Sequence, residues 1–166
     1  PTGTAVAGDI YYSTTAGLQV SNGTSFSPIG GVRPVYNAAT VLTAADSGAI
    51  CFFGTAAGYT YTLPTPALGL TFDFEVLVTI TSVAAKILTP ASTFLLGNYI
   101  QSTDSTYTSA SHTADGTTIR AWSGNGSTTG GLIGDWIRVV GLSATQYAVW
   151  GMGRATGTEA TPFATS

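Results

Sequence analysis

The sequence predicts an all-β fold: an antiparallel β-sandwich or a jelly-roll-like barrel, with an N-terminal β-hairpin arm and an extended C-terminal tail. Threonine, which favours strands, is abundant, whereas Lys, Glu, Gln, Arg and Met, which favour helices, are scarce. Apolar and polar residues alternate with a period of two in several segments. Turns rich in Gly and Pro separate these segments at short intervals, and no βαβ rhythm appears, which is typical of sandwiches and barrels.

The size and charge of the chain narrow the classes of function. Its 166 residues are enough for one globular domain with arms, which needs neither disulfides nor metals to form a core. Charged residues make up 8% of the chain, whereas an average soluble domain has roughly 25%. So low a charge is typical of a surface that packs against neighbours. The net charge of −3 and the five scattered Lys and Arg residues argue against nucleic-acid binding.

Residues 1–34 are expected to form a hairpin arm and a linker. Residues 10–13 and 18–20 are predicted strands around a turn at 14–17, and Asn22-Gly23 is a strong turn signal. Phe26, Pro28 and the pair Gly30-Gly31 look like a linker. An isolated hairpin is marginally stable, so the arm must pack on the main domain, a neighbouring subunit or another protein. The candidate partner-binding residues of the arm are Ile10, Tyr11, Tyr12, Leu18, Val20 and Phe26.

Residues 35–153 are expected to form the sandwich core, and residues 154–166 an extended tail. In the predicted strand 59–63, Tyr59, Tyr61 and Leu63 share one face. In the long predicted strand 71–80, Phe72, Phe74, Val76, Val78 and Ile80 share one face. Further strands are predicted at 93–100, 117–122, 136–140 and 146–152. Residues 104–116 are expected to form a polar loop or an irregular edge strand, and residues 37–46 to hold a short helical turn.

No catalytic site is predicted. The single histidine, His112, lies in a Ser/Thr-rich stretch without a recognisable nucleophile motif, and we expect it to be an exposed loop residue. Asp73 and Glu75 lie on the same face of one strand, whereas a glycosidase places two carboxylates on either side of a sugar. We expect them to face solvent or to pair with Arg120, Arg138 or Lys86 on an adjacent strand.

No metal site or cofactor is predicted either. One His and one Cys are too few for a structural zinc site, and no EF-hand spacing is present. Cys51 lies in an apolar run and is expected to be a buried thiol, which suits a reducing cytoplasm. Trp122, Trp136 and Trp150 lie in apolar strands, where packing in the core or at a subunit interface is expected rather than sugar stacking.

Targeting signals are not apparent in the sequence. The first residues have neither a basic region nor an apolar run, so no signal peptide is predicted. The most apolar stretch, 70–96, is interrupted by Asp73, Glu75, Lys86 and Pro90, so no transmembrane helix or membrane partner is predicted.

Two stretches carry a resemblance to phage particle proteins. The segment from Gly8-Asp9-Ile10-Tyr11-Tyr12 to Asn22-Gly23-Thr24 resembles a hairpin of phage tail, fibre and head-surface proteins. The motifs Leu42-Thr43-Ala44-Ala45-Asp46-Ser47-Gly48, Tyr61-Thr62-Leu63-Pro64 and Gly134-Asp135-Trp136 resemble a β domain of phage virion proteins. The resemblance covers about two-thirds of the chain and implies a homotrimer located in the virion and assembled in the host cytoplasm.

Two functions are consistent with the resemblance and the absence of a catalytic motif. The leading hypothesis is a capsid decoration or cement protein that binds the major capsid protein or another virion protein. The short chain and the two expected arms favour it. The alternative is a tail-fibre or receptor-binding module that recognises host-surface glycan.

Overall fold

The structure of the 166-residue chain is a computed structural model that describes residues 6–13, 17–21, 23, 26–28, 33–103 and 108–166. It confirms the all-β sandwich, with strands, turns and one short 3₁₀ helix among the described residues. The chain divides into two compact units, Pro1–Arg33 and Pro34–Ser166. This boundary lies one residue from the one expected between residues 34 and 35.

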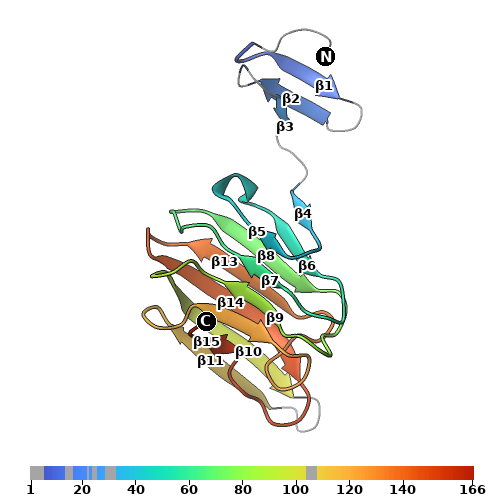
Figure 1. The fold of residues 1–166 in the computed structure, drawn as a ribbon, viewed down its shortest axis with the longest axis vertical. Coiled ribbons are helices and arrows are strands. Elements are labelled where there is room, and N and C mark those ends of the chain that lie inside the picture. The colour runs from blue at the N-terminus through green and yellow to red at the C-terminus, as the bar shows by residue number, and fades with distance from the viewer. Residues whose placement is uncertain (1–5, 14–16, 22, 24–25, 29–32, 104–107) are drawn as a thin grey trace. The chain divides into compact units, whose positions relative to one another are not determined.

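The first unit is a three-stranded antiparallel sheet of β1 (Ile10–Ser13), β2 (Gly17–Ser21) and β3 (Phe26–Pro28), in that order (Figure 1). The predicted hairpin is present, but Phe26–Pro28 is a third strand rather than part of a linker. Gly23 has a φ of 94°, as its predicted turn requires. The other expected turn and linker residues, 14–16, 22, 30 and 31, lie outside the described residues.

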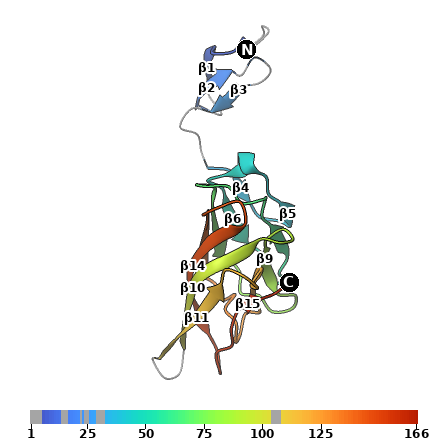
Figure 2. The same cartoon turned by 90° about the vertical axis from the view of Figure 1, so that its left-hand side faces the viewer.

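The second unit is a sandwich of a seven-stranded and a five-stranded sheet, which Figure 2 shows as separate layers. The first half of this unit alternates between the two sheets. The seven-stranded sheet receives β4 (Val35–Tyr36), β6 (Ile50–Phe53) and β8 (Thr71–Val76), and the five-stranded sheet receives β5 (Thr40–Val41), β7 (Thr60–Thr62) and β9 (Ala85–Leu88). Strands that follow one another in the same sheet are parallel. The expected antiparallel arrangement is therefore wrong for this half, because the chain returns to each sheet in its original direction.

The second half of the unit completes both sheets, and each sheet keeps two edge strands, so the described part forms no closed barrel. The seven-stranded order is β11-β10-β14-β13-β8-β6-β4, and the five-stranded order is β15-β12-β9-β7-β5. The added strands are β10 (Phe94–Thr103), β11 (Ser109–Asp115), β12 (Ala121–Gly124), β13 (Trp136–Gly141), β14 (Gln146–Ala155) and β15 (Phe163–Ala164). β10 and β14 are parallel along their whole length, from the pair Phe94–Gln146 to the pair Thr103–Ala155.

The C-terminal segment, expected to be an extended tail, is part of the sandwich. β14 continues to Ala155, beyond the boundary expected at Gly153, and residues 154–166 belong to the second unit. Phe163 pairs with Trp122 across β15 and β12 and is part of the hydrophobic core. The segment is therefore built into the sandwich, because its aromatic side chain is buried between the sheets.

The core lies between the two sheets and follows the predicted alternation over most of its length. Phe72, Phe74 and Val76 are buried, as are Tyr61 and Leu63 in and beside β7. The predicted strand 71–80 ends at Val76, because the amides of residues 77 and 78 both donate to the carbonyl of residue 53, at 3.0 and 3.2 Å. Beyond that point the alternation is lost: residue 80 is buried and residue 78 is exposed. The buried Cys51 thiol is confirmed.

The predicted strand 117–122 begins only at Ala121. The Asp115 carboxylate accepts hydrogen bonds from the backbone N–H groups of Thr117 and Thr118, each at 2.8 Å, and of Ile119 at 3.2 Å. These bonds fold the first residues of the segment into a turn, since a local carboxylate competes with the sheet for backbone donors.

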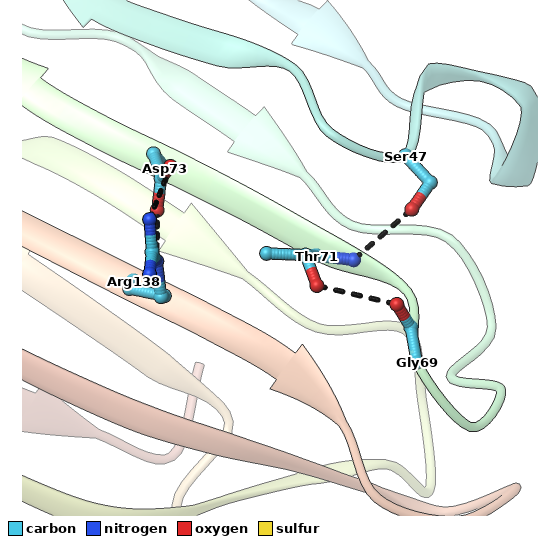
Figure 3. Close-up of polar contacts among 5 residues, drawn as sticks. All are labelled: Ser47, Gly69, Thr71, Asp73 and Arg138. Atoms are coloured by element: carbon cyan, nitrogen blue, oxygen red, sulfur yellow. Dashed lines mark hydrogen bonds and ion pairs between the residues drawn. The ribbon is translucent and has the colours of Figure 1, made fainter.

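The motif Leu42–Gly48 forms the junction between β5 and β6 and contains the predicted helical turn, η1 (Ala44–Asp46). The Asp46 carboxylate accepts hydrogen bonds from the Thr43 N–H at 2.8 Å and from the Tyr36 hydroxyl. The Ser47 hydroxyl accepts the N–H of Thr71 at 3.1 Å, at the start of β8 (Figure 3). Through these polar contacts, the motif joins β4 and β8 of the sandwich.

Replacing Asp46 by Asn tests this junction through its pH dependence. The hydrogen bond from Tyr36 lowers the pKa of Asp46. The stabilisation that the ionised Asp46 gives to the folded state is therefore complete above the ordinary carboxyl pKa of about 3.9. It is lost as the pH falls further, toward the lowered pKa of the folded state. We expect Asp46→Asn to cost about 1 kcal/mol at neutral pH, as loss of a helix cap does, and less at pH below about 3.

Urea unfolding at both pH values measures the difference. Tyr36→Phe removes the main cause of the pKa shift and keeps the carboxyl group, so it should reproduce part of the same loss. Equal destabilisation of the Asp46→Asn variant at both pH values would contradict this account.

Candidate interaction surfaces

The first candidate surface lies on the three-stranded sheet of the N-terminal unit. Ile10 and Val20 are register partners in β1 and β2, and Tyr12 follows Ile10 on the same face. Ile10 is 67% exposed, Tyr12 68% and Val20 36%. We call these three residues the arm face. Three of the six predicted arm residues thus share a largely exposed apolar surface.

The other three predicted arm residues do not join this set. Tyr11, which is 37% exposed, lies on the opposite face because it alternates with Ile10 and Tyr12. The backbone of Leu18 pairs with that of Tyr12, and the backbone of Phe26 pairs with that of Ser21. The side chains of Leu18 and Phe26 lie outside what the structure describes.

The second candidate surface lies on the face of the seven-stranded sheet that points away from the core. Large apolar side chains on β10, β13 and β14 are exposed here by 40% to 53%. Ile100, Met152 and Trp136 are register partners and form one row across the three strands. Trp150 lies in the next row on this face, with Asn98 and Arg138, and Leu96 lies in the row after that. We call this set the outer patch: Leu96, Ile100, Trp136, Trp150 and Met152.

The three tryptophans are therefore divided between two environments. Trp122 is fully buried and its ring centroid lies 5.7 Å from that of Tyr99, so it is a core residue. Trp136 and Trp150 lie on the outer patch. Exposed aromatic and Met side chains grouped on one face are typical of binding surfaces.

Polar and charged side chains border the outer patch. On β13, Arg138 is the register partner of Trp150 on one side and of Asp73 on the other. Its Nη2 donates to one carboxylate oxygen of Asp73 at 2.8 Å, and its Nε donates to the other oxygen (Figure 3). Arg138 is the predicted cation that pairs with Asp73, whereas Arg120 and Lys86 donate to the backbone carbonyls of Thr89 and Ser166. The ion pair engages both oxygens of the Asp73 carboxylate.

A depression of about 220 Å³ lies at one end of the outer patch, lined by Trp136, Met152, Arg154 and Ser102 above Asp135. Asp135 is 1% exposed. Its Oδ2 accepts from the N–H groups of Gly131 and Leu132 and from the Tyr99 hydroxyl, and its Oδ1 accepts from the N–H of Arg154. Ligand pockets usually measure roughly 300–1,000 Å³. The depression is smaller, and its buried carboxylate is already engaged by four donors.

His112 differs from the exposed loop residue expected from the sequence. It lies in the edge strand β11 and is partly buried, and its Nε2 has no hydrogen-bond partner among the described residues. Burial lowers the pKa of His112, and the nearby Glu159 carboxylate acts in the opposite direction. No hydroxyl of a described residue is bonded to Nε2, as the hydroxyl of an activated nucleophile would be.

No group of three or more His, Cys, Asp or Glu residues among the described residues is placed to hold a metal ion. No helix in the described ranges has the length and apolar character needed to cross a membrane.

The outer patch was missed in the sequence because its residues belong to three separate strands. The alternation in each strand indicates two faces but does not say which residues of different strands become neighbours. Most of the residues that alternate with Trp136, Trp150 and Met152 are buried. It is the tertiary structure that leaves these three side chains exposed on the other face of their strands.

Replacing Asp135 by Ala tests the buried hydrogen-bond network beneath the outer patch. The change leaves four donors without their acceptor, and we expect it to lower the free energy of unfolding by about 3 kcal/mol or more. Tyr99→Phe removes a single donor and should cost about 1 kcal/mol. Urea unfolding measures both, and equal stability of Asp135→Ala and the wild type would show that the network is unimportant.

Comparisons with known proteins provide no template for these surfaces. No protein-family model, no curated protein and no solved structure matches the chain. What the arm face and the outer patch bind is therefore inferred from their own chemistry.

Proposed function

We propose that the protein is a non-catalytic structural component of a bacteriophage virion: a homotrimeric decoration protein that binds the major capsid protein and stabilises the head. The observation that carries the proposal is the arm face. Ile10 and Tyr12 are each about two-thirds exposed on a sheet of only three strands. Large apolar side chains displayed in this way are a source of binding energy for a protein partner.

The small apolar surface of the arm face is consistent with a segment that binds a partner weakly. Burying one large apolar side chain contributes roughly 1.5–3 kcal/mol. The arm face of one chain therefore binds weakly by itself. A homotrimer presents three arms to a symmetric site on the head, and linked weak contacts then give a much higher overall affinity.

The chemistry of the remaining polar groups supports a structural role. Asp73 is held by Arg138, Asp135 is buried among four donors, and His112 Nε2 has no hydrogen-bond partner in the part of the chain that the structure describes. These arrangements favour a structural role over acid–base catalysis. The buried Cys51 thiol suits assembly in the host cytoplasm.

The phage assignment itself draws on the resemblance of the sequence motifs. In the structure, Asp46 and Ser47 of the first motif join strands, and Asp135 of the Gly134-Asp135-Trp136 motif is buried. The motif residues described here thus hold the sandwich together, and the resemblance concerns structural positions rather than a binding site.

Substitution of the arm face tests the proposal. Heads of the phage that encodes the protein, prepared without it, would be mixed with the full-length chain and sedimented, and bound copies counted. We expect the wild type to saturate many sites per head. The variant Ile10→Thr/Tyr12→Thr keeps strand-favouring residues and should bind at least about tenfold more weakly, since it removes two apolar contacts.

The matched control replaces two exposed valines of the second unit, Val41→Thr/Val83→Thr, and should bind like the wild type. Wild-type affinity of the arm-face variant would show that the arm does not bind the head. Recovery of only a few copies, all at the tail, would replace decoration by a fibre role.

A second candidate, a receptor-binding module for host glycan, is favoured by one observation. Trp136 and Trp150 are exposed on the same sheet face, beside the amide of Asn98 and the Arg138–Asp73 pair. Exposed aromatic rings next to polar groups can stack on sugar rings and bind their hydroxyls. Binding to a glycan array that is lost in Trp150→Ala would support this function over decoration.

A further inference from the structure

We propose that residues 156–161 form an acid-sensitive strap, which closes over His112 at neutral pH and opens when the imidazole takes up a proton. The strap lies between two buried positions, Ala155 at the end of β14 and Phe163 in β15. It is a conformational device of the sandwich and is independent of what the arm face binds.

Backbone hydrogen bonds hold the strap near both of its ends. The Thr156 N–H donates to the Ser127 carbonyl at 3.0 Å, and the Ala160 N–H donates to the Thr128 carbonyl at 2.9 Å. The strap residues are exposed, apart from Glu159, which is partly buried. Segments with few buried contacts and exposed backbone hydrogen bonds open at a lower free energy than the core does. The strap is therefore placed to open while the sandwich stays folded.

The strap covers polar side chains on the inner face of β10 and β11. Gln101 on β10 is fully buried and lies diagonally opposite His112 on that face. Its Nε2 donates to the Thr128 carbonyl at 3.2 Å, the same oxygen that accepts from Ala160. Glu159 precedes Ala160, and its carboxylate acts on the charge of His112. These links bring Gln101, His112 and Glu159 into one cluster.

Each member of this cluster has a buried polar atom without a hydrogen-bond partner among the described residues: Oε1 of Gln101, Nε2 of His112 and Oε1 of Glu159. A protonated imidazole has an N–H donor on both ring nitrogens and needs an acceptor for each. The closed strap gives Nε2 no such acceptor, so burial favours the neutral ring. Burial accordingly lowers the pKa of His112, and the attraction of Glu159 offsets only part of that effect.

The other titratable groups around His112 do not reverse this effect. On β10, Tyr99 is its register partner, and burial and the Asp135 carboxylate raise the pKa of the Tyr99 hydroxyl, which stays neutral. On β11 itself, Asp115 lies on the opposite face because it is an odd number of residues away. Arg120, which precedes β12, donates to a backbone carbonyl beyond β9. The strand β15, which contacts β11, has no titratable side chain.

Proton uptake and strap opening are therefore coupled. In the open state His112 is solvated and has an ordinary pKa of about 6.5. Above that pH the ring is neutral in both states, and the closed strap has its full stability. As the pH falls below about 6.5, the open state takes up a proton more readily than the closed state does. The equilibrium shifts toward opening until the pH reaches the lowered pKa of the closed state.

Nuclear magnetic resonance of the full-length chain tests this coupling, because His112 is its one histidine. The imidazole resonance should titrate below the ordinary value of about 6.5. Hydrogen exchange at the Thr156 and Ala160 amides is compared after correction for the intrinsic effect of pH. Their protection should fall by about threefold to tenfold between about pH 7.5 and about pH 5.5, because a solvated histidine is about tenfold more protonated than neutral at the lower value. The amides of β13 should keep their protection.

Variants separate the roles of the imidazole, the carboxylate and the strap. His112→Gln keeps a polar side chain without a titrating group, so its strap amides should be equally protected at both pH values. Glu159→Gln removes the opposing charge, so the pKa of His112 should fall further. Ala160→Pro removes an N–H that holds the strap and should raise the pKa of His112 toward its ordinary value. The matched control, Thr158→Ala, changes an exposed strap residue and should leave that pKa unchanged.

Three results would overturn the inference: a His112 pKa at or above about 6.5, strap protection that changes by less than about threefold, or an equal acid response in His112→Gln. Equal loss of protection in β13 and in the strap would also overturn it, because the whole sandwich would then be opening. Should Ala160→Pro not fold, the Glu159→Gln titration and the exchange of the wild type still decide between these outcomes.

Discussion

A buried carboxylate, Asp135, holds together the part of the sandwich that carries the outer patch. Its two oxygens accept four hydrogen bonds, which connect the turn before β13 to Tyr99 on β10 and to Arg154 on β14. Burial raises the pKa of Asp135, and these hydrogen bonds only partly offset the cost of a desolvated charge. The cost is tolerated because the alternative is four buried donors without an acceptor.

The same group explains why a glycine occupies position 153. A Cβ there would lie 1.8 Å from the Tyr99 hydroxyl oxygen and 2.6 Å from the Asp135 carboxylate. Only a residue without a side chain lets β14 pass this close to the network. Because Met152 and Arg154 flank this glycine, the buried network also fixes the strand that displays the outer patch.

The low charge of the chain and its exposed apolar surfaces both favour association with other molecules. Few charges mean little repulsion between copies, so apolar contacts of modest area can drive association. The arm face and the outer patch lie on separate units and differ in character, a small group of three residues and a wider surface with Trp at its centre. If the arm face binds the head as proposed, several linked copies would give the multivalency that a decoration protein needs.

Local patterns allowed the sequence to predict much of this fold. The hairpin, the alternation of Phe72, Phe74 and Val76 and the turn before Ser47 follow from side-chain chemistry within a few residues. The third strand at Phe26–Pro28 and the late start of β12 were not predicted, because they depend on hydrogen bonds that the alternation does not show.

By itself, the sequence determined the all-β class and the division between the N-terminal hairpin unit and the sandwich, to within one residue. Only the tertiary structure decided that the first strands of the sandwich, β4 to β9, pair in parallel within each sheet, that Phe163 of the C-terminal segment is buried and that Trp136, Trp150 and Met152 lie together. The reason is physical: alternation fixes which side chains of one strand share a face. The winding of the chain between two sheets decides which strands become neighbours and which face meets water.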